Sequence, residues 1–185
     1  MNILVGITGA SGCIYGIRLV EELKKLGVKI HLIISEKAEK IIKYETNYAI
    51  EDIERLVEKK YDNDDLFAGP ASGSYRLDGL VISPCSIKSL SSIANSFCDN
   101  LISRAAVCCL KEGVKLIIVL RETPLDLASI NNMKKAKLGG AVILPAMPSF
   151  YHLPKNIDEL INFVVGKILD QLDLKHNLFN RWEIL

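Results

Sequence analysis

Two charged residues, Arg121 and Glu122, directly follow the apolar run LIIVL at 116–120. Charges at the mouth of a buried strand need water, each other or a ligand, because burying an uncompensated charge is costly. An arginine suits a phosphate or a ring rich in carbonyl groups, and a glutamate can move protons. The pattern therefore favours a functional role for both residues over a purely structural one.

A glycine-rich loop follows the first apolar run, with Gly6, Gly9, Gly12 and Gly16 placed around Ser11. Glycine lets backbone N–H groups and a helix N-terminus approach an anion closely. The spacing is neither G-x-G-x-x-G nor G-x-x-x-x-G-K-[ST], so it gives poor support to a dinucleotide fingerprint or a nucleotide P-loop. A ligand-binding loop and a tight turn that needs glycine for packing both remain open.

Hydroxyl and charged side chains also follow the apolar run at 80–83, at Ser86, Lys88 and Ser89. They can hold a phosphate or a ring carbonyl, but on their own they are explained by helix capping. Glu45, in the segment KYETN, would by itself be a solvated glutamate. The three histidines are far apart in the sequence, so no set of metal ligands is predicted.

Apolar runs alternate with helical periodicity along the chain. Strands are predicted over 2–8, 28–34, 80–83, 116–120 and 141–144. Helices are predicted over 12–26, 36–44, from 86, over 124–137 and over 156–172. The alternation predicts an α/β fold, with a three-layer, Rossmann- or flavodoxin-like, mostly parallel sheet and helices on both faces. Ligands of such sheets bind outside the carboxyl ends of the strands, where the loops described above lie.

The composition fits a single α/β domain over residues 1–185, of which 49% are hydrophobic. The formal net charge is +1 and no stripe of Lys or Arg occurs, which weighs against a nucleic-acid surface. No apolar stretch reaches the ~20 residues of a membrane-spanning helix. A surplus of apolar residues hints at surface buried between subunits. The least regular stretch, 58–77, is expected to be a functional or mobile loop.

The cysteine pattern and the N-terminus bear on the compartment. Five cysteines are an odd number, and no Cys-x-x-Cys occurs, so neither a disulfide framework nor a zinc site is predicted. The N-terminus lacks the charged start and long apolar run of a signal peptide. A reduced, cytoplasmic protein is the simplest interpretation.

An ordered set of segments covers nearly the whole chain and resembles one known family. The segments are GITGASGCIYGIRL, YETN, ASGSYRLDGLVISPCSIKSLSSIA, LISRAAVCCLKE, VLRETPL, LGGAVILPAMPSFYHLPKNIDELINFVVGKILD and the closing FNRWE. Together they resemble the UbiX/Pad1 family of flavin prenyltransferases. The resemblance implies a flavoprotein domain that joins a dimethylallyl group from dimethylallyl monophosphate to N5 and C6 of reduced FMN. It also implies that no metal is needed, that twelve copies assemble, and that UbiD-type decarboxylases receive the prenylated FMN.

The resemblance implies roles for individual residues, carried over by position. Those implied to bind FMN are Gly9, Ala10, Ser11, Ser35, Ser86, Ile87, Lys88, Ser89 and Arg121. Those implied to bind the dimethylallyl phosphate are Tyr151, Lys167, Lys111 and Arg104. Those implied to act in the chemistry are Ser11, Glu45 and Glu122. Several of these contacts cross subunit boundaries in the family.

Two positions depart from the family pattern. Lys167 stands where many members have arginine, so the bidentate fork of a guanidinium is lost there. Some members carry a tryptophan in the loop before ASGS, and here Leu66 or Phe67 stands nearby. The chemistry otherwise makes physical sense, since cationic side chains stabilise a departing phosphate and a base, Glu122 or the phosphate itself, can remove the ring proton.

Other flavoprotein activities are alternatives. A cysteine decarboxylase of related type would need a histidine after the second strand, but 35–57 contains none, and its substrate segment P-x-M-N-x-x-M-W is replaced by PAMPSFYH. A non-catalytic FMN carrier is a second alternative, and binding of dimethylallyl phosphate would distinguish the prenyltransferase from it. A third is an aromatic decarboxylase that acts alone, which would release carbon dioxide without a UbiD partner. A hydride-transferring oxidoreductase stays formally open through Glu36 near the second strand.

Overall fold

The sheet has six strands that all run parallel, in the order β3-β2-β1-β4-β5-β6. The computed structural model describes residues 1–182, so Glu183 of the closing FNRWE segment lies outside the described residues. The strands are β1 (Asn2–Ile7), β2 (Lys29–Ile34), β3 (Lys59–Tyr61), β4 (Gly79–Cys85), β5 (Lys115–Leu120) and β6 (Val142–Ile143). The chain moves outward from β1 to β3 and then crosses back to β4, so the order reverses between β1 and β4. A crevice for a ligand is expected at that reversal.

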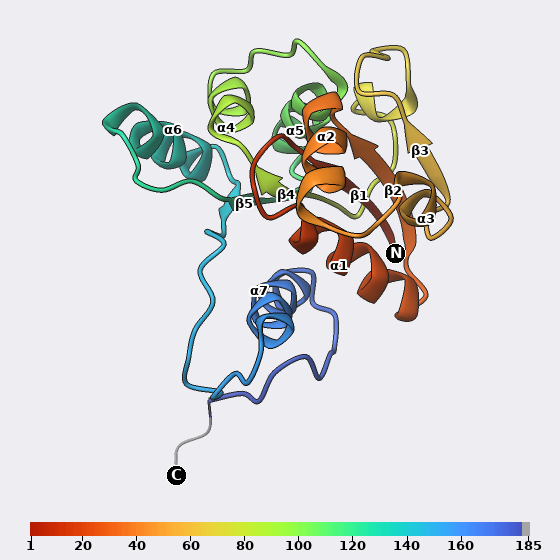
Figure 1. The fold of residues 1–185 in the computed structure, drawn as a ribbon. Coiled ribbons are helices and arrows are strands. Elements are labelled where there is room, and N and C mark those ends of the chain that lie inside the picture. Colours follow the sequence, from red (N-terminus) through yellow and green to blue (C-terminus); the bar gives the residue numbers. More distant parts are fainter. Residues whose placement is uncertain (183–185) are drawn as a thin grey trace.

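Helices cover both faces of the sheet, as Figure 1 shows. They are α1 (Cys13–Lys25), α2 (Glu36–Glu45), α3 (Ile50–Glu54), α4 (Ile87–Ala94), α5 (Leu101–Glu112), α6 (Leu127–Leu138) and α7 (Ile157–Gln171), with a 3-10 turn η1 (Gly69–Ala71). The three-layer α/β fold predicted from the sequence is confirmed. No helix within residues 1–182 is long and apolar enough to cross a bilayer.

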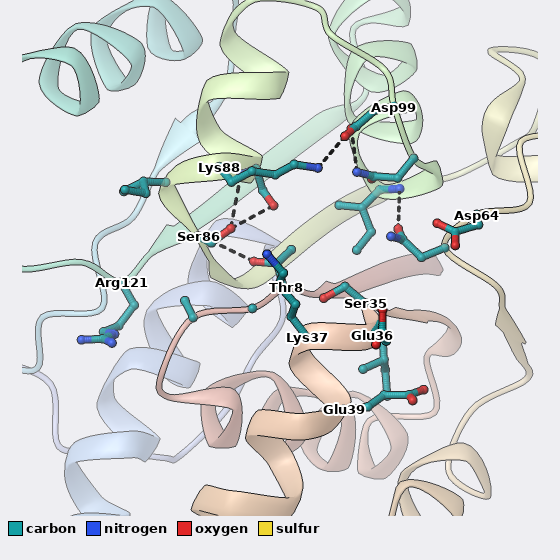
Figure 2. A pocket seen from close by; sticks show the side chains of 18 of the residues that line it. Thr8, Ser35, Glu36, Lys37, Glu39, Asp64, Ser86, Lys88, Asp99 and Arg121 are labelled. Atoms are coloured by element: carbon teal, nitrogen blue, oxygen red, sulfur yellow. Dashed lines mark hydrogen bonds and ion pairs between the residues drawn. The ribbon is translucent and has the colours of Figure 1, made fainter.

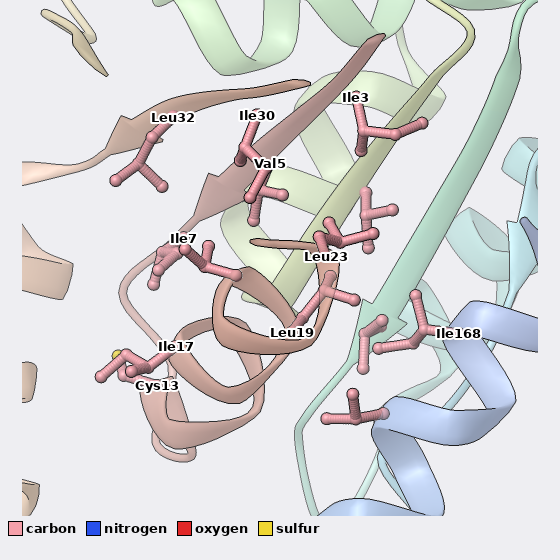
Figure 3. Packing of buried hydrophobic residues seen from close by; sticks show 14 of the residues in the cluster. Ile3, Val5, Ile7, Cys13, Ile17, Leu19, Leu23, Ile30, Leu32 and Ile168 are labelled. Carbon is pink, nitrogen blue, oxygen red and sulfur yellow. The ribbon is translucent and has the colours of Figure 1, made fainter. Parts of the chain in front are cut away.

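The core is divided into two clusters by the sheet, because successive side chains of a strand point to opposite faces. Ile3, Val5 and Ile7 of β1 pack with residues of α1 and α7 on one face (Figure 3). Leu4 of β1 packs on the other face, with α4 and α5. The strands are therefore buried on both sides, which explains why their sequences are continuous apolar runs.

Polar caps fix where the helices begin. The hydroxyl of Ser35 accepts a hydrogen bond from the Ala38 N–H at 3.2 Å and caps α2, and Ser86 caps α4. The helix predicted over 124–137 begins later, at Leu127, because Asp126 is its N-cap and accepts from the Ser129 N–H at 2.6 Å. The irregular stretch 58–77 contains one edge strand, β3, that the sequence pattern does not reveal.

Candidate flavin site

A cavity of about 900 Å³ opens at the carboxyl edge of the sheet, in the crevice between β1 and β4 (Figure 2). This size lies within the range of about 300–1,000 Å³ that is typical of small-molecule and cofactor sites. Every residue expected to bind the flavin lines it, together with Glu122. These residues are Gly9, Ala10, Ser11, Ser35, Ser86, Ile87, Lys88, Ser89 and Arg121.

The loop between β1 and α1 is held close to α2 and to β5. A Cβ atom added at Gly9 would lie 2.7 Å from the Cβ of Lys37, so only glycine lets this loop approach α2. Arg121 donates from Nε to the backbone oxygen of Ser11 at 3.1 Å. The Glu45 carboxylate accepts from the Gly12 N–H at 2.8 Å, which places Glu45 at the N-terminus of α1 beside Ser11.

A buried hydroxyl joins the loops after β1 and β4. The Oγ1 atom of Thr8 donates to the backbone oxygen of Pro84 at 2.8 Å and accepts from the Ser86 N–H, also at 2.8 Å. This arrangement fixes the start of α4, whose first-turn N–H groups have no acceptor within the helix and border the cavity. The Lys88 ammonium is held at 2.6 Å from Asp99 across the rim (Figure 2).

Replacing Thr8 by Val is expected to lower the free energy of unfolding by about 1–3 kcal/mol, because the partly buried N–H of Ser86 loses its acceptor. FMN affinity should fall as well, since the start of α4 is released. Urea unfolding and a flavin titration measure the two effects. Thr46→Val is the control and should lose less stability, because the Thr46 hydroxyl is only partly buried. Equal stability of the Thr8→Val and wild-type proteins would contradict the prediction.

One side of the cavity is lined by charged residues of which the sequence patterns identify only Glu36. They are Glu36, Lys37, Glu39, Lys60, Asp62, Asp64 and Asp99. Lys60 donates to Glu39 at 3.0 Å and to Glu54 at 2.7 Å, so β3 is tied to α2 and α3 through one ammonium group. Recognising β3 as a strand would have placed the acids that follow it at this edge of the sheet.

Glu122 lies exposed at the rim of the cavity, next to Arg121. Its Oε1 atom accepts from the Thr123 N–H at 3.2 Å. Leu66 and Phe67 do not line the cavity; Phe67 is fully exposed in this chain. Among residues 1–182, no three His, Cys, Asp or Glu side chains stand close enough together to hold a metal ion.

The residues expected to bind the dimethylallyl phosphate are not among those lining the cavity. Arg104 and Lys111 lie two turns apart on α5, where Arg104 donates from Nε to the backbone oxygen of Ala71 at 2.9 Å. Lys167 lies on α7, and Tyr151 precedes that helix and packs its ring edge-on to Phe163 at 5.9 Å. Because α5 and α7 pack on opposite faces, the sheet separates the two pairs.

Comparison with known proteins decides the family. A family model described as Flavoprotein matches residues 1–169. The flavin prenyltransferase UbiX of Thauera aromatica is 51% identical over 182 residues, which is 98% of this chain and 94% of that protein. The chain belongs to the UbiX family of flavin prenyltransferases.

Solved UbiX structures match the whole fold. A UbiX protein crystallised with FMN and dimethylallyl pyrophosphate superposes with a TM-score of 0.97 and 42% identity, over 100% of this chain and 98% of that one. A dodecameric FMN-dependent UbiX-like decarboxylase from Escherichia coli O157:H7 gives a TM-score of 0.97 and 38% identity, over 99% of this chain and 100% of that one. The cavity of this chain suits such a flavin, since backbone N–H groups of the glycine loop and of helix N-termini can donate hydrogen bonds to its phosphate, and serine hydroxyls can donate to its ring carbonyls.

Proposed function

We propose that this chain transfers the dimethylallyl group of a dimethylallyl phosphate to N5 and C6 of reduced FMN. One observation carries the proposal: the glycine loop, the start of α4, Arg121 and Glu122 border a single cavity at the strand-order reversal. Reduced FMN, when bound, supplies the electron-rich nucleophile. The product would serve a UbiD-type decarboxylase, which needs the prenylated flavin that this chain does not itself consume.

Each group at the cavity has a task in this scheme. Backbone N–H groups around Gly9 and at the start of α4 would hold the flavin phosphate, because helix N-termini favour anions. Arg121 is already oriented by its bond to the Ser11 backbone and leaves its Nη atoms for the ligand. Glu122 would accept the proton that leaves the ring carbon after bond formation, with Ser11 and Glu45 close to the same loop.

The phosphate of the prenyl donor would bind between copies of the chain. Arg104 and Lys111 lie on one face of the sheet and Tyr151 and Lys167 on the other, and none of the four lines the cavity of its own copy. A second copy can bring one pair to the cavity edge of its neighbour. We therefore propose a homododecamer, as described for the Escherichia coli relative. Cationic groups from two copies would then stabilise the departing phosphate.

The test is anaerobic incubation of the protein with reduced FMN and dimethylallyl monophosphate, followed by mass spectrometry of the extracted flavin. A mass gain of one C5H8 unit is expected, and dimethylallyl pyrophosphate is tried in parallel. Unmodified flavin in both reactions, with reduction verified, would refute prenyl transfer and favour an FMN carrier. Release of carbon dioxide from an aromatic acid by this chain alone would favour the decarboxylase alternative.

Co-assembly of two damaged variants tests the shared site. Glu122→Gln and Lys167→Ala chains, each nearly inactive alone, should regain activity at about a quarter of sites when mixed equally during assembly, because some sites then combine two intact contributions. Lys167→Ala mixed with Tyr151→Phe is the control and should show no recovery, since both residues belong to one contributing surface. Lack of recovery in the first mixture would place Glu122 and Lys167 of one site in the same copy.

The recipient and the compartment are part of the proposal. A UbiD-type apo-decarboxylase should gain activity when it is supplied with the flavin product of this chain. All five cysteines are free thiols, which supports a reducing, cytoplasmic location. Fractionation of cells that express the protein tests the location, and recovery of the chain outside the cytoplasm would contradict it.

A further inference from the structure

The C-terminal segment, residues 173–182, folds back along α7, the helix that carries Lys167 (Figure 1). Gly166, in the middle of α7, allows this contact. A Cβ atom added there would lie 2.7 Å from His176 and 2.5 Å from Phe179. Glycine is disfavoured in a helix interior. Its presence at the point of contact therefore indicates that the sequence is adapted to the packing of the C-terminal segment on α7.

Asp170 accepts hydrogen bonds from the cationic side chains near this contact. Its Oδ2 atom accepts from the Lys167 ammonium at 3.3 Å and from Arg181 Nη1 at 3.2 Å, and its Oδ1 atom accepts from Arg181 Nη2 at 2.7 Å. The nearly buried ring of His176 also contacts Oδ1, at 3.1 Å. Lys167 and Arg181 thus share one oxygen atom and stand side by side.

The charge state of Asp170 suits this role. Burial raises its pKa, but the hydrogen bonds from Arg181, Lys167 and His176 outweigh burial and hold the pKa below its usual value. The carboxylate is therefore ionised at neutral pH. Lys167 and Arg181 each keep further N–H donors, since an ammonium has three and a guanidinium five.

Tyr151 lies beside the same segment. Its ring meets the ring of Trp182 edge-on, with 5.4 Å between the centroids, and Trp182 directly follows Arg181. Of the residues proposed above to bind the prenyl phosphate, Lys167 therefore has Arg181 as an immediate neighbour, and Tyr151 contacts the residue that follows Arg181. A guanidinium presents a planar fork that an ammonium lacks, and it suits a phosphate better.

We infer that Arg181 is a further ligand of the prenyl phosphate, that it supplies the guanidinium missing at position 167, and that Asp170 positions it together with Lys167. This inference rests on the proposed function, since it concerns the phosphate end of the same donor. The docked segment then serves to bring Arg181 to the site.

Binding of dimethylallyl monophosphate to the intact, assembled protein in the presence of oxidised FMN tests the inference without turnover. Calorimetry should give a Kd about tenfold higher for Arg181→Ala than for the wild type, and an intermediate Kd for Arg181→Lys, because a charge-assisted hydrogen-bonding fork is lost stepwise. Arg55→Ala is the matched control. Arg55 is exposed and pairs with Asp52 at the end of α3, far from this segment in sequence, and its loss should leave the Kd unchanged.

Two further measurements separate a phosphate ligand from a structural role. Arg181→Ala should raise KM for the dimethylallyl phosphate about tenfold while the Kd for FMN and the melting temperature stay at wild-type values. Asp170→Asn should also raise that KM, and it should change the fluorescence of Trp182, the single tryptophan of the chain. Equal Kd values for wild type and Arg181→Ala would overturn the inference.

The outcomes also distinguish the inference from the proposed function. If the wild type prenylates FMN but Arg181→Ala binds and reacts with unchanged constants, the proposed function stands and Arg181 is not a ligand. If no prenylation occurs but the Kd for the monophosphate shifts as expected, the anion site stands and the proposed function fails. If the wild type does not bind the monophosphate, Arg181 is not its ligand.

Discussion

Replacing Glu122 by Gln will slow prenyl transfer by about 10²–10⁴-fold while FMN remains bound, as expected for loss of a general base. Glutamine keeps the shape of glutamate and its bond from the Thr123 N–H, but it cannot take up a proton at neutral pH. The FMN phosphate would still meet the glycine loop and the start of α4, which the substitution does not touch. The loss should therefore appear in kcat, with little change in the Kd for FMN.

Single-turnover mixing of the reduced, FMN-loaded variant with dimethylallyl monophosphate measures the rate directly. Glu51→Gln, which removes an exposed carboxylate on α3, is the control and should react at the wild-type rate. A wild-type rate for Glu122→Gln would remove this residue from the mechanism. The departing phosphate would then be the better candidate for the base.

Replacing Gly16 by Ala will lower the free energy of unfolding by about 3 kcal/mol, at the upper end of ordinary overpacking. The new methyl group would collide with the backbone oxygen of Ser83 and would lie 3.0 Å from Ile7 side-chain atoms. Ser83 belongs to β4, which is buried on both faces in the centre of the sheet, so its backbone has no room to retreat.

Urea unfolding at equilibrium tests this prediction, with Gly139→Ala as the control. Gly139 follows α6 with a helical φ of −73°. The atom nearest to a Cβ added at Gly139 would be 3.4 Å away, so alanine fits there. The control should be neutral or slightly stabilising, because alanine reduces the freedom of the unfolded chain. Equal stability of the two variants would show that α1 can move away from β4.

The carboxyl-end loops were predictable from the sequence because parallel strands end at one edge of their sheet. The apolar runs before Gly9, Ser86 and Arg121 located those ends, and the three loops indeed border one cavity. The edge strand β3 was missed. Its sequence, KKY, has only Tyr61 buried and pairs with β2 alone, so it carries little of the apolar signal that identifies a strand.

The division of the phosphate-binding residues between two faces could not be predicted from the sequence. Lys111 and Lys167 both lie on amphipathic helices, and periodicity shows that each helix has a buried side but not which face of the sheet it covers. That choice depends on strand order and on the hand of each crossover, which are properties of the whole chain. The neighbours of Arg181 could not be predicted from the sequence for a similar reason, because they depend on how the C-terminal segment packs on Gly166.

The separation of α5 and α7 by the sheet has a genetic consequence. With catalytic sites shared between copies, as proposed here, a chain damaged on its α7 side still folds and enters assemblies through its intact surfaces. It then disables the site of the neighbour to which it contributes, while its own cavity can still be completed by an intact neighbour. In a cell that makes one form altered at Lys167 and another altered at Glu122, the two alleles should therefore partly complement each other. A form altered at Lys167 that is made together with the wild type should lower the activity only in proportion to its share of the chains.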